Sequence, residues 1–422
     1  MSLRSIEEHL AAVLATIRPT PTVQVAIADA LGCTLAEPVR SRVDLPGFTN
    51  SAMDGYAVRA SDCVGASEDT PVELSVEGDI AAGETRELAL TPGRCWRIMT
   101  GAPLPYGADA VVPVELSDGG VDRVRLRLEP ELGRHVRARG EDLRAGDEIL
   151  AAGTLVTPGR LALLAAANVA AVPAHTRPRV AVISTGDELR DPGTDLGHGE
   201  IVDSNSLMLV ALVRAVGAEP VLRARARDDA GSFRAILEEA AAGADLVLTT
   251  GGVSMGAYDT VKEVLSGRGS VDFAKVAMRP GMPQGHGVIG AGATPLVTLP
   301  GNPLSAMVSF HVFVLPAIAA LQGRGGGSAS WRAGAVPARA GAGWPSVGGK
   351  TELTRVTLRD GRAWPASGQG SHMVGALADS NALAIVPPEV TDVAEGDELD
   401  CIPLLGAGSW SGAVGSGAGA PA

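Results

Sequence analysis

Three glycine-containing loops carry the residues whose types and spacing could do chemistry. Each follows an apolar run, and they read Thr185-Gly186-Asp187-Glu188-Leu189, Thr249-Thr250-Gly251-Gly252-Val253-Ser254-Met255-Gly256 and Pro300-Gly301-Asn302-Pro303-Leu304-Ser305. Glycine has no Cβ, so backbone N–H groups can approach a ligand, and a helix starting in such a loop adds positive partial charge. The loops therefore suit phosphate or another oxyanion. One such loop alone could be only a tight turn, and none of the three loops is a GxxxxGK[ST] or a GxGxxG motif.

Carboxylates surround these loops. Asp187, Glu188, Asp228 and Asp259 would repel a bound phosphate unless a hard cation such as Mg²⁺ stood between them. The alternative for each carboxylate is helix capping or a solvated surface position. From the residues alone we therefore predict an anion-binding α/β enzyme and go no further.

Other polar segments are more ambiguous. Lys275 and Arg279 precede a Pro-Gly turn and could neutralise an anion, although Arg279 could equally be a surface charge. Polar groups also gather at 50–57 and 99–103, where the Asp54-Gly55 pair is typical of a turn. Asp142 lies in a short stretch of mixed charge, a pattern typical of a solvated salt-bridge patch.

The elements that must position the three loops alternate between strand and helix patterns from about 178 to 322. Apolar runs at 179–185, 220–226, 244–250 and 294–299 predict strands, and the longer stretches between them predict helices. Strands separated by helices of ten or more residues predict a mostly parallel sheet covered on both faces, a three-layer α/β domain. Because ligands bind beyond the carboxyl ends of parallel strands, the three loops should face one crevice.

The regions on either side are predicted to be β-rich. Residues 20–150 contain short strands and turns, and a helix is predicted over 157–172 with Thr157 as its cap. After a flexible linker at 322–330, a hairpin turning at Asp360-Gly361 and two further strands predict a small β-barrel-like domain. The predicted boundaries are 1–172 for the mainly β region, whose N-terminal helix could pack on the α/β domain, 173–322 for the α/β domain, 331–405 for the C-terminal domain and 406–422 for a disordered tail.

Composition excludes several classes of protein. A chain of 422 residues predicts about three domains at roughly 150 residues each. A net charge of −13 and only 3% aromatic residues disfavour nucleic-acid or anionic-membrane partners. The four cysteines form no CxxC, which predicts free buried thiols, and we see neither a signal-peptide core nor an apolar stretch long enough to cross a bilayer. We therefore expect a cytoplasmic protein.

In order along nearly the whole chain, seven segments resemble the MoeA family, the molybdopterin molybdenumtransferases that include the catalytic domain of gephyrin. They are PGFTNSAMDGYAV (46–58), RIMTGAPLPYGADAVVPVE (97–115), RARGEDLRAGD (137–147), VISTGDEL (182–189), IVDSNS (201–206), LTTGGVSMGAYD (248–259) and LPGNPLSAMVSF (299–310).

The resemblance implies insertion of molybdate into the dithiolene of adenylylated molybdopterin, with Mg²⁺-dependent release of AMP. The catalytic positions it implies are Asp54, Thr100, Asp142, Glu188, Asp228 and Asp259, with Asp228 and Asp259 as Mg²⁺ ligands. An oxyanion pocket is implied at Arg279, Met282, Pro283, Ser305, Arg355 and Ser371. The glycine loops and the cationic segment supply the remaining predicted substrate-binding positions, Gly251, Gly252, Ser254, Lys275, Pro300, Gly301 and Asn302.

Two positions depart from the family pattern. Arg279 stands where the family usually has Lys, and Met282 stands where a second Lys is common, so one charge is lost. The resemblance also implies an elongated homodimer, whose cleft lies between one subunit's α/β domain and its partner's N-terminal β region, and contact with the molybdopterin adenylyltransferase. The alternatives are that adenylyltransferase itself, which lacks the N-terminal half, a gephyrin-like scaffold, or a tungstate-inserting paralogue.

Overall fold

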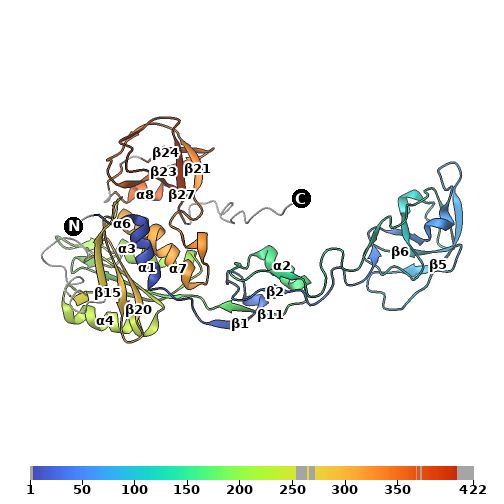
Figure 1. The fold of residues 1–422 in the computed structure, drawn as a ribbon, viewed down its shortest axis with the longest axis horizontal. Helices are drawn as coiled ribbons and strands as arrows, with labels where there is room; N and C mark the ends of the chain where they lie inside the picture. Colours follow the sequence, from blue (N-terminus) through green and yellow to red (C-terminus); the bar gives the residue numbers. More distant parts are fainter. Residues whose placement is uncertain (1–2, 253–263, 266–270, 367, 371–372, 406–422) are drawn as a thin grey trace.

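The computed structural model describes residues 3–252, 264–265, 271–366, 368–370 and 373–405. The chain is elongated, with an α/β domain and a β domain together at one end (Figure 1). A slender region containing β1 (Thr22–Ala26), β11 (Ala171–His175) and α2 (Pro158–Ala166) connects them to a separate β sheet at the other end. This architecture confirms the predicted multidomain α/β and β fold.

A six-stranded sheet forms the centre of the α/β domain. Its order is β15 (Glu219–Ala226), β12 (Arg179–Thr185), β16 (Leu246–Thr250), β20 (Thr294–Leu299), β19 (Pro283–Ile289) and β17 (Val271–Lys275). The pairings among the first four strands are parallel, as predicted. The antiparallel strands β19 and β17 were not predicted, and for β19 the reason is that the glycines and prolines between 280 and 290 indicated turns.

Helices cover both faces of this sheet, so the three-layer prediction is confirmed. On one face α1 (Ile6–Ala15), α3 (Ser204–Ala215), α6 (Pro303–Ser309) and α7 (Leu315–Leu321) share a core with β12, β16 and β20. The other face is covered by α4 (Ala230–Gly243). Asp203 and Asp229 cap α3 and α4 by accepting hydrogen bonds from the backbone N–H groups of Ser206 and Ser232.

The 19-residue segment Pro303–Leu321 is one apolar helix interrupted by a π-turn at Phe310–Val314. Pro316 explains the interruption, because its ring would clash with a carbonyl one turn earlier in a regular helix. With a mean hydropathy of 2.0, the segment is long and apolar enough to cross a membrane, so the expectation of no such stretch was wrong. Protein atoms bury 83% of it, as expected for the central helix of an α/β core.

The N-terminal region contains two small cores. The first surrounds α2, the ribbon β1–β11 and the pair β2 (Val39–Arg40) and β10 (Glu148–Leu150). The second belongs to a sheet ordered β7 (Ala110–Pro113), β4 (Gly55–Val58), β6 (Arg94–Ile98), β5 (Val72–Ile80) and β8 (Arg123–Leu126), beside which β3 (Asn50–Ser51) pairs with β9 (Val136–Arg137).

The helix predicted over 157–172 is shorter than expected. It begins after Thr157, whose side chain caps it, but α2 ends at Ala166. Asn168 has φ +57°, a conformation that stops a helix, and the chain continues into β11. A boundary at 172 would therefore cut β11, the partner of β1, so the N-terminal region extends to His175.

The C-terminal domain is a closed five-stranded barrel. Its order is β23 (Thr351–Arg359), β24 (Arg362–Pro365), β21 (Val336–Ala340), β27 (Glu398–Pro403) and β25 (Ala382–Val386), and β25 pairs back with β23. Asp360 and Gly361 both have positive φ at the predicted hairpin turn. The two-residue strands β22 (Trp344–Pro345) and β26 (Asp392–Val393) and the turn α8 (Gly375–Ala378) complete the domain.

The barrel is attached to the α/β domain by more than the chain connection. The predicted flexible linker contains a short 3-10 turn at Gly326–Ala329, followed by Trp331, whose indole N–H donates to Glu7 of α1. The short strand β18 (Met278–Arg279) pairs in parallel with β23. A shared core of apolar residues from α1, β18, α6 and the barrel fills this seam. The four cysteines are buried and form no disulfide, as predicted.

Candidate functional site: the carboxyl edge of the central sheet

The three glycine loops meet at one edge of the sheet, because β12, β16 and β20 are parallel neighbours. Gly251 has φ +92°, and a Cβ there would lie 2.7 Å from the Thr185 carbonyl oxygen. The buried amide of Asn205, on α3, donates to the Thr250 hydroxyl (2.9 Å) and to the Gly301 carbonyl (2.7 Å). Gly251 therefore has no room for a side chain, and the Asn205 amide ties the ends of β16 and β20 together.

Two acidic residues contact each other at the ends of β12 and β15. The Asp187 N–H donates to an Asp228 carboxylate oxygen (3.2 Å), and the Asp228 N–H donates to an Asp187 carboxylate oxygen (3.3 Å). Both residues are exposed. The Glu188 carboxylate folds back over Gly186 in the same loop, because a Cβ on Gly186 would be within 2.6 Å of both its oxygens. Asp187 is absent from the positions implied by the family resemblance, although its place next to Glu188 was a signal.

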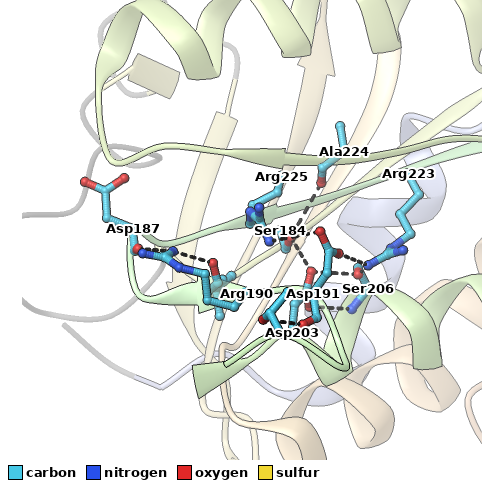
Figure 2. Close-up of polar contacts among 11 residues, drawn as sticks. Ser184, Asp187, Arg190, Asp191, Asp203, Ser206, Arg223, Ala224 and Arg225 are labelled. Carbon is cyan, nitrogen blue, oxygen red and sulfur yellow. Dashed lines mark hydrogen bonds and ion pairs between the residues drawn. The ribbon is translucent and has the colours of Figure 1, made fainter. Parts of the chain in front are cut away.

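The acidic loop is held by three arginines, as Figure 2 shows. Arg190 donates to the Asp187 carbonyl (2.8 Å) and pairs with Glu200, whose pKa is lowered chiefly by a hydrogen bond from the Gly197 N–H. Asp191 accepts from Arg223 (3.0 Å) and lies 3.6 Å from the Arg225 guanidinium. These contacts fix both ends of the turn that carries Asp187 and Glu188.

A buried carboxylate lies beneath this loop. Asp203 is 3% exposed and accepts hydrogen bonds from the hydroxyls of Ser184 and Ser206, both at 2.7 Å (Figure 2). Ser206 in turn accepts from the Arg223 guanidinium at 2.8 Å. The network therefore joins the end of β12, the start of α3 and the edge strand β15.

A cationic turn occupies the other end of the same edge. β19 begins at Pro283, and Lys275 at the end of β17 pairs with it, so both lie beside the end of β20. Gln284 holds the turn by donating to the Gly281 carbonyl and to the Ser309 hydroxyl, both at 2.6 Å. Ser309 is one helical turn after Ser305, so Ser305 lies on the same face of α6.

The charge of Arg279 is partly compensated. Its guanidinium lies 3.7 Å from Glu352 of the barrel, and the Arg279 side chain is 49% exposed. Pro300, Gly301 and Asn302 lie between this turn and the acidic loop, at the start of α6. The edge therefore runs from carboxylates through glycine loops to cations, which suits an extended anionic ligand that needs different partners at its two ends.

Arg355 does not line this edge. It is fully buried, and its guanidinium donates to the carbonyls of Met373 (2.8 Å), Gly370 (3.4 Å) and Gly368. Burial lowers the pKa of Arg355. Its described contacts therefore hold the backbone of residues 368, 370 and 373. The predicted positions Ser254, Asp259 and Ser371 lie outside the residues that the structure describes.

The predicted residues of the N-terminal region lie far from the sheet edge within one chain. Thr100 donates its N–H (2.6 Å) and its hydroxyl (2.8 Å) to one oxygen of Asp54, and these bonds lower the pKa of Asp54. Asp54 immediately precedes β4 and Thr100 follows β6, and the sheet containing β6 lies at the opposite end of the molecule from β15 and β20 (Figure 1). Asp142 is exposed, and its N–H donates to the Leu45 carbonyl (3.0 Å).

Asp187 and Asp228 suit a magnesium ion better than a metal whose ligands all come from the protein. Among the described residues no group of three or more His, Cys, Asp or Glu side chains could hold a metal. Mg²⁺ needs no such cage, because it keeps several waters and binds through one or two carboxylates together with substrate phosphates. Asp187 and Asp228 offer two neighbouring exposed carboxylates, which is the number of protein ligands that such a Mg²⁺ ion uses.

The fold and the carboxyl edge of the central sheet indicate a class of protein. It is a multidomain α/β protein whose site suits an anionic ligand between a carboxylate pair and a cationic turn. Comparison with known proteins narrows the class. The sequence matches the MoeA N-terminal region (domain I and II) over 4–168, a probable molybdopterin binding domain over 181–320 and the MoeA C-terminal region (domain IV) over 337–404. The chain belongs to the MoeA family.

Individual relatives match over almost the whole chain. The molybdopterin molybdenumtransferase 2 of Mycobacterium tuberculosis is 45% identical over 406 residues, covering 94% of this chain and 98% of that protein. The molybdopterin molybdenumtransferase of Bacillus subtilis is 36% identical over 378 residues, covering 86% and 85%. The crystal structure of a molybdopterin biosynthesis MoeA protein from Pyrococcus horikoshii superposes with a TM-score of 0.82 at 29% identity, covering 95% and 100%.

Proposed function

We propose that this chain inserts molybdate into adenylylated molybdopterin and releases AMP. The observation that supports the proposal most strongly is the order of groups along the sheet edge. Asp228 and Asp187 are at one end, Gly251 and Gly301 are in the middle, and the 279–283 turn is at the other end. Four strand steps of about 4.8 Å each separate β15 from β19, roughly 19 Å. That length suits a pterin nucleotide with its pyrophosphate near the carboxylates and its dithiolene near the cations.

Each group has a role in this proposal. Gly251, Gly252 and the start of α6 bind the pyrophosphate through backbone N–H groups. Asp187 and Asp228 hold Mg²⁺, and Glu188 lies against the same loop. When bound, Mg²⁺ would offset the charge that develops on the phosphate as AMP leaves. Asp259, outside the described residues, keeps the metal-binding role implied by the resemblance.

The N-terminal region completes the site only in a dimer. Asp54 and Thr100 lie far from the sheet edge of their own chain, and Asp54 is held ionised by its hydrogen bonds from Thr100. We therefore propose a homodimer in which Asp54 of the partner subunit enters the crevice. The adenylyltransferase that makes the pterin nucleotide is proposed as a further partner. The four free thiols support a cytoplasmic location, where thiols stay reduced.

The decisive experiment measures AMP release from adenylylated molybdopterin, with and without molybdate and Mg²⁺. Release should require both, and D228N should retain the pterin nucleotide while releasing little AMP. E239Q, an exposed carboxylate on α4, is the matched control and should behave as the unaltered protein. R279A should raise the molybdate requirement without weakening nucleotide binding. Release that ignores molybdate would refute the transfer reaction, and release driven by tungstate alone would identify a tungstate enzyme.

A further inference from the structure

Lys350 lies at the seam between the barrel and the cationic turn. It is one of only three lysines in the chain and immediately precedes β23. Its ammonium nitrogen is 3.5 Å from the Met282 sulfur, and the residue is half-buried. In the pairing of β18 with β23, Met278 lies opposite Thr351 and Arg279 opposite Glu352. Lys350 immediately precedes Thr351 and so lies beside the same turn.

This ammonium has no carboxylate partner among the described residues, although one carboxylate is close in sequence. Glu352 already accepts from the Ser346 hydroxyl (2.7 Å) and the Val347 N–H (3.1 Å), while its other oxygen faces Arg279. A thioether is a weak acceptor, and an ammonium is strongly hydrated. The Lys350 ammonium, half-buried against the Met282 sulfur, therefore leaves most of its N–H donors without a strong acceptor. It does so at the end of the sheet edge that already carries the Arg279 charge.

We propose that Lys350 is an oxyanion-binding residue, and that it supplies from the barrel the second positive charge of the 279–283 turn. The inference rests on the proposed function, since the oxyanion it names is molybdate. A tetrahedral dianion placed over Met282 and Pro283 would meet the Arg279 guanidinium on one side and the Lys350 ammonium on the other. The four-carbon stem of lysine lets the ammonium turn from the sulfur to the ligand with little displacement of the backbone.

The test moves the charge between two neighbouring positions. Molybdate binding is measured by equilibrium dialysis for the unaltered protein, for K350M, and for the double variant K350M/M282K. We expect K350M to bind molybdate at least about tenfold more weakly, as expected for losing a charged hydrogen bond, and the double variant to recover most of this loss. R362A removes a barrel cation that pairs with Glu395 elsewhere, and its affinity should be unchanged.

Binding of the adenylylated pterin, measured on the same samples, separates the possible failures. K350M with normal molybdate affinity would overturn the role of Lys350 and leave the proposed function standing. An unaltered protein that binds the pterin nucleotide but no molybdate would overturn both. Thermal unfolding checks that K350M is folded, and K350Q serves as a second neutral variant. Tungstate is titrated in parallel because its charge and shape are the same.

Discussion

Acid should loosen helix α1 through His9. The His9 ring is completely buried, 4.9 Å from the Phe313 ring and 5.0 Å from the His286 ring. Neither His9 nitrogen has a hydrogen-bond partner among the described residues. Burial, with repulsion from His286 and Arg4, lowers the pKa of His9 from 6.5 to about 3, and Asp272 opposes this only weakly. Protonation of His9 in the folded protein therefore lowers the free energy of unfolding.

The size of the effect follows from the pKa difference. The unfolded chain binds more protons than the folded chain between pH 6.5 and about 3, so stability falls as the pH falls through this window. At about 1.4 kcal/mol per pKa unit, moving from pH 7 to pH 5 removes about 2 kcal/mol through His9 alone. Burial also lowers the pKa of His286, which acts in the same direction. The loss falls on the seam, because α1 packs there against β18 and the barrel.

Urea unfolding of the unaltered protein and of H9L at pH 7 and pH 5 measures this difference. The unaltered protein should lose about 2 kcal/mol more than H9L on acidification. Amide hydrogen exchange of α1 should show where the loss occurs. H198Q, which removes an exposed histidine, should match the unaltered protein. Equal acid losses in H9L and the unaltered protein would show that His9 is not the source and would refute the reasoning.

Two further predictions concern hydrogen bonds to carboxylates. D203A leaves the hydroxyls of Ser184 and Ser206 and the Ser206 N–H without their acceptor, so it should destabilise the α/β domain by about 3–5 kcal/mol. Hydrogen exchange at the start of α3 would reveal this, and unchanged protection there would contradict it. T100V removes one of two donors and should raise the pKa of Asp54 toward its ordinary value of 3.8. The stability that this lowered pKa supplies is present above pH 3.8 and is lost as the pH falls through the folded-state pKa of Asp54. T100V should therefore narrow the pH range over which this stability is lost. Carboxyl NMR titration measures the Asp54 pKa, and no change would assign the whole effect to the Thr100 N–H.

Local patterns in the sequence were enough to predict much of the fold. The apolar runs of β12, β16 and β20 are buried parallel strands, and such strands have a recognisable composition. Parallel pairing then required their following loops to share one edge, which the structure bears out. β19 escaped prediction because it contains one proline and two glycines, so its place in the sheet depends on pairing with β20 and β17 rather than on local propensity.

Pairings between distant residues came only from the tertiary structure. Asp187 and Asp228 are 41 positions apart, and Met282 and Lys350 are 68 apart. The contact of Asp187 with Asp228 depends on the register of β12 and β15. The contact of Met282 with Lys350 depends on the packing of the barrel against β18. Sequence likewise did not reveal that Arg355 is buried beneath its own domain's loop. Residue type and spacing thus determined which chemistry this chain could carry, whereas long-range strand pairing and core packing decided which side chains meet, because neither leaves a periodic signal in the local sequence.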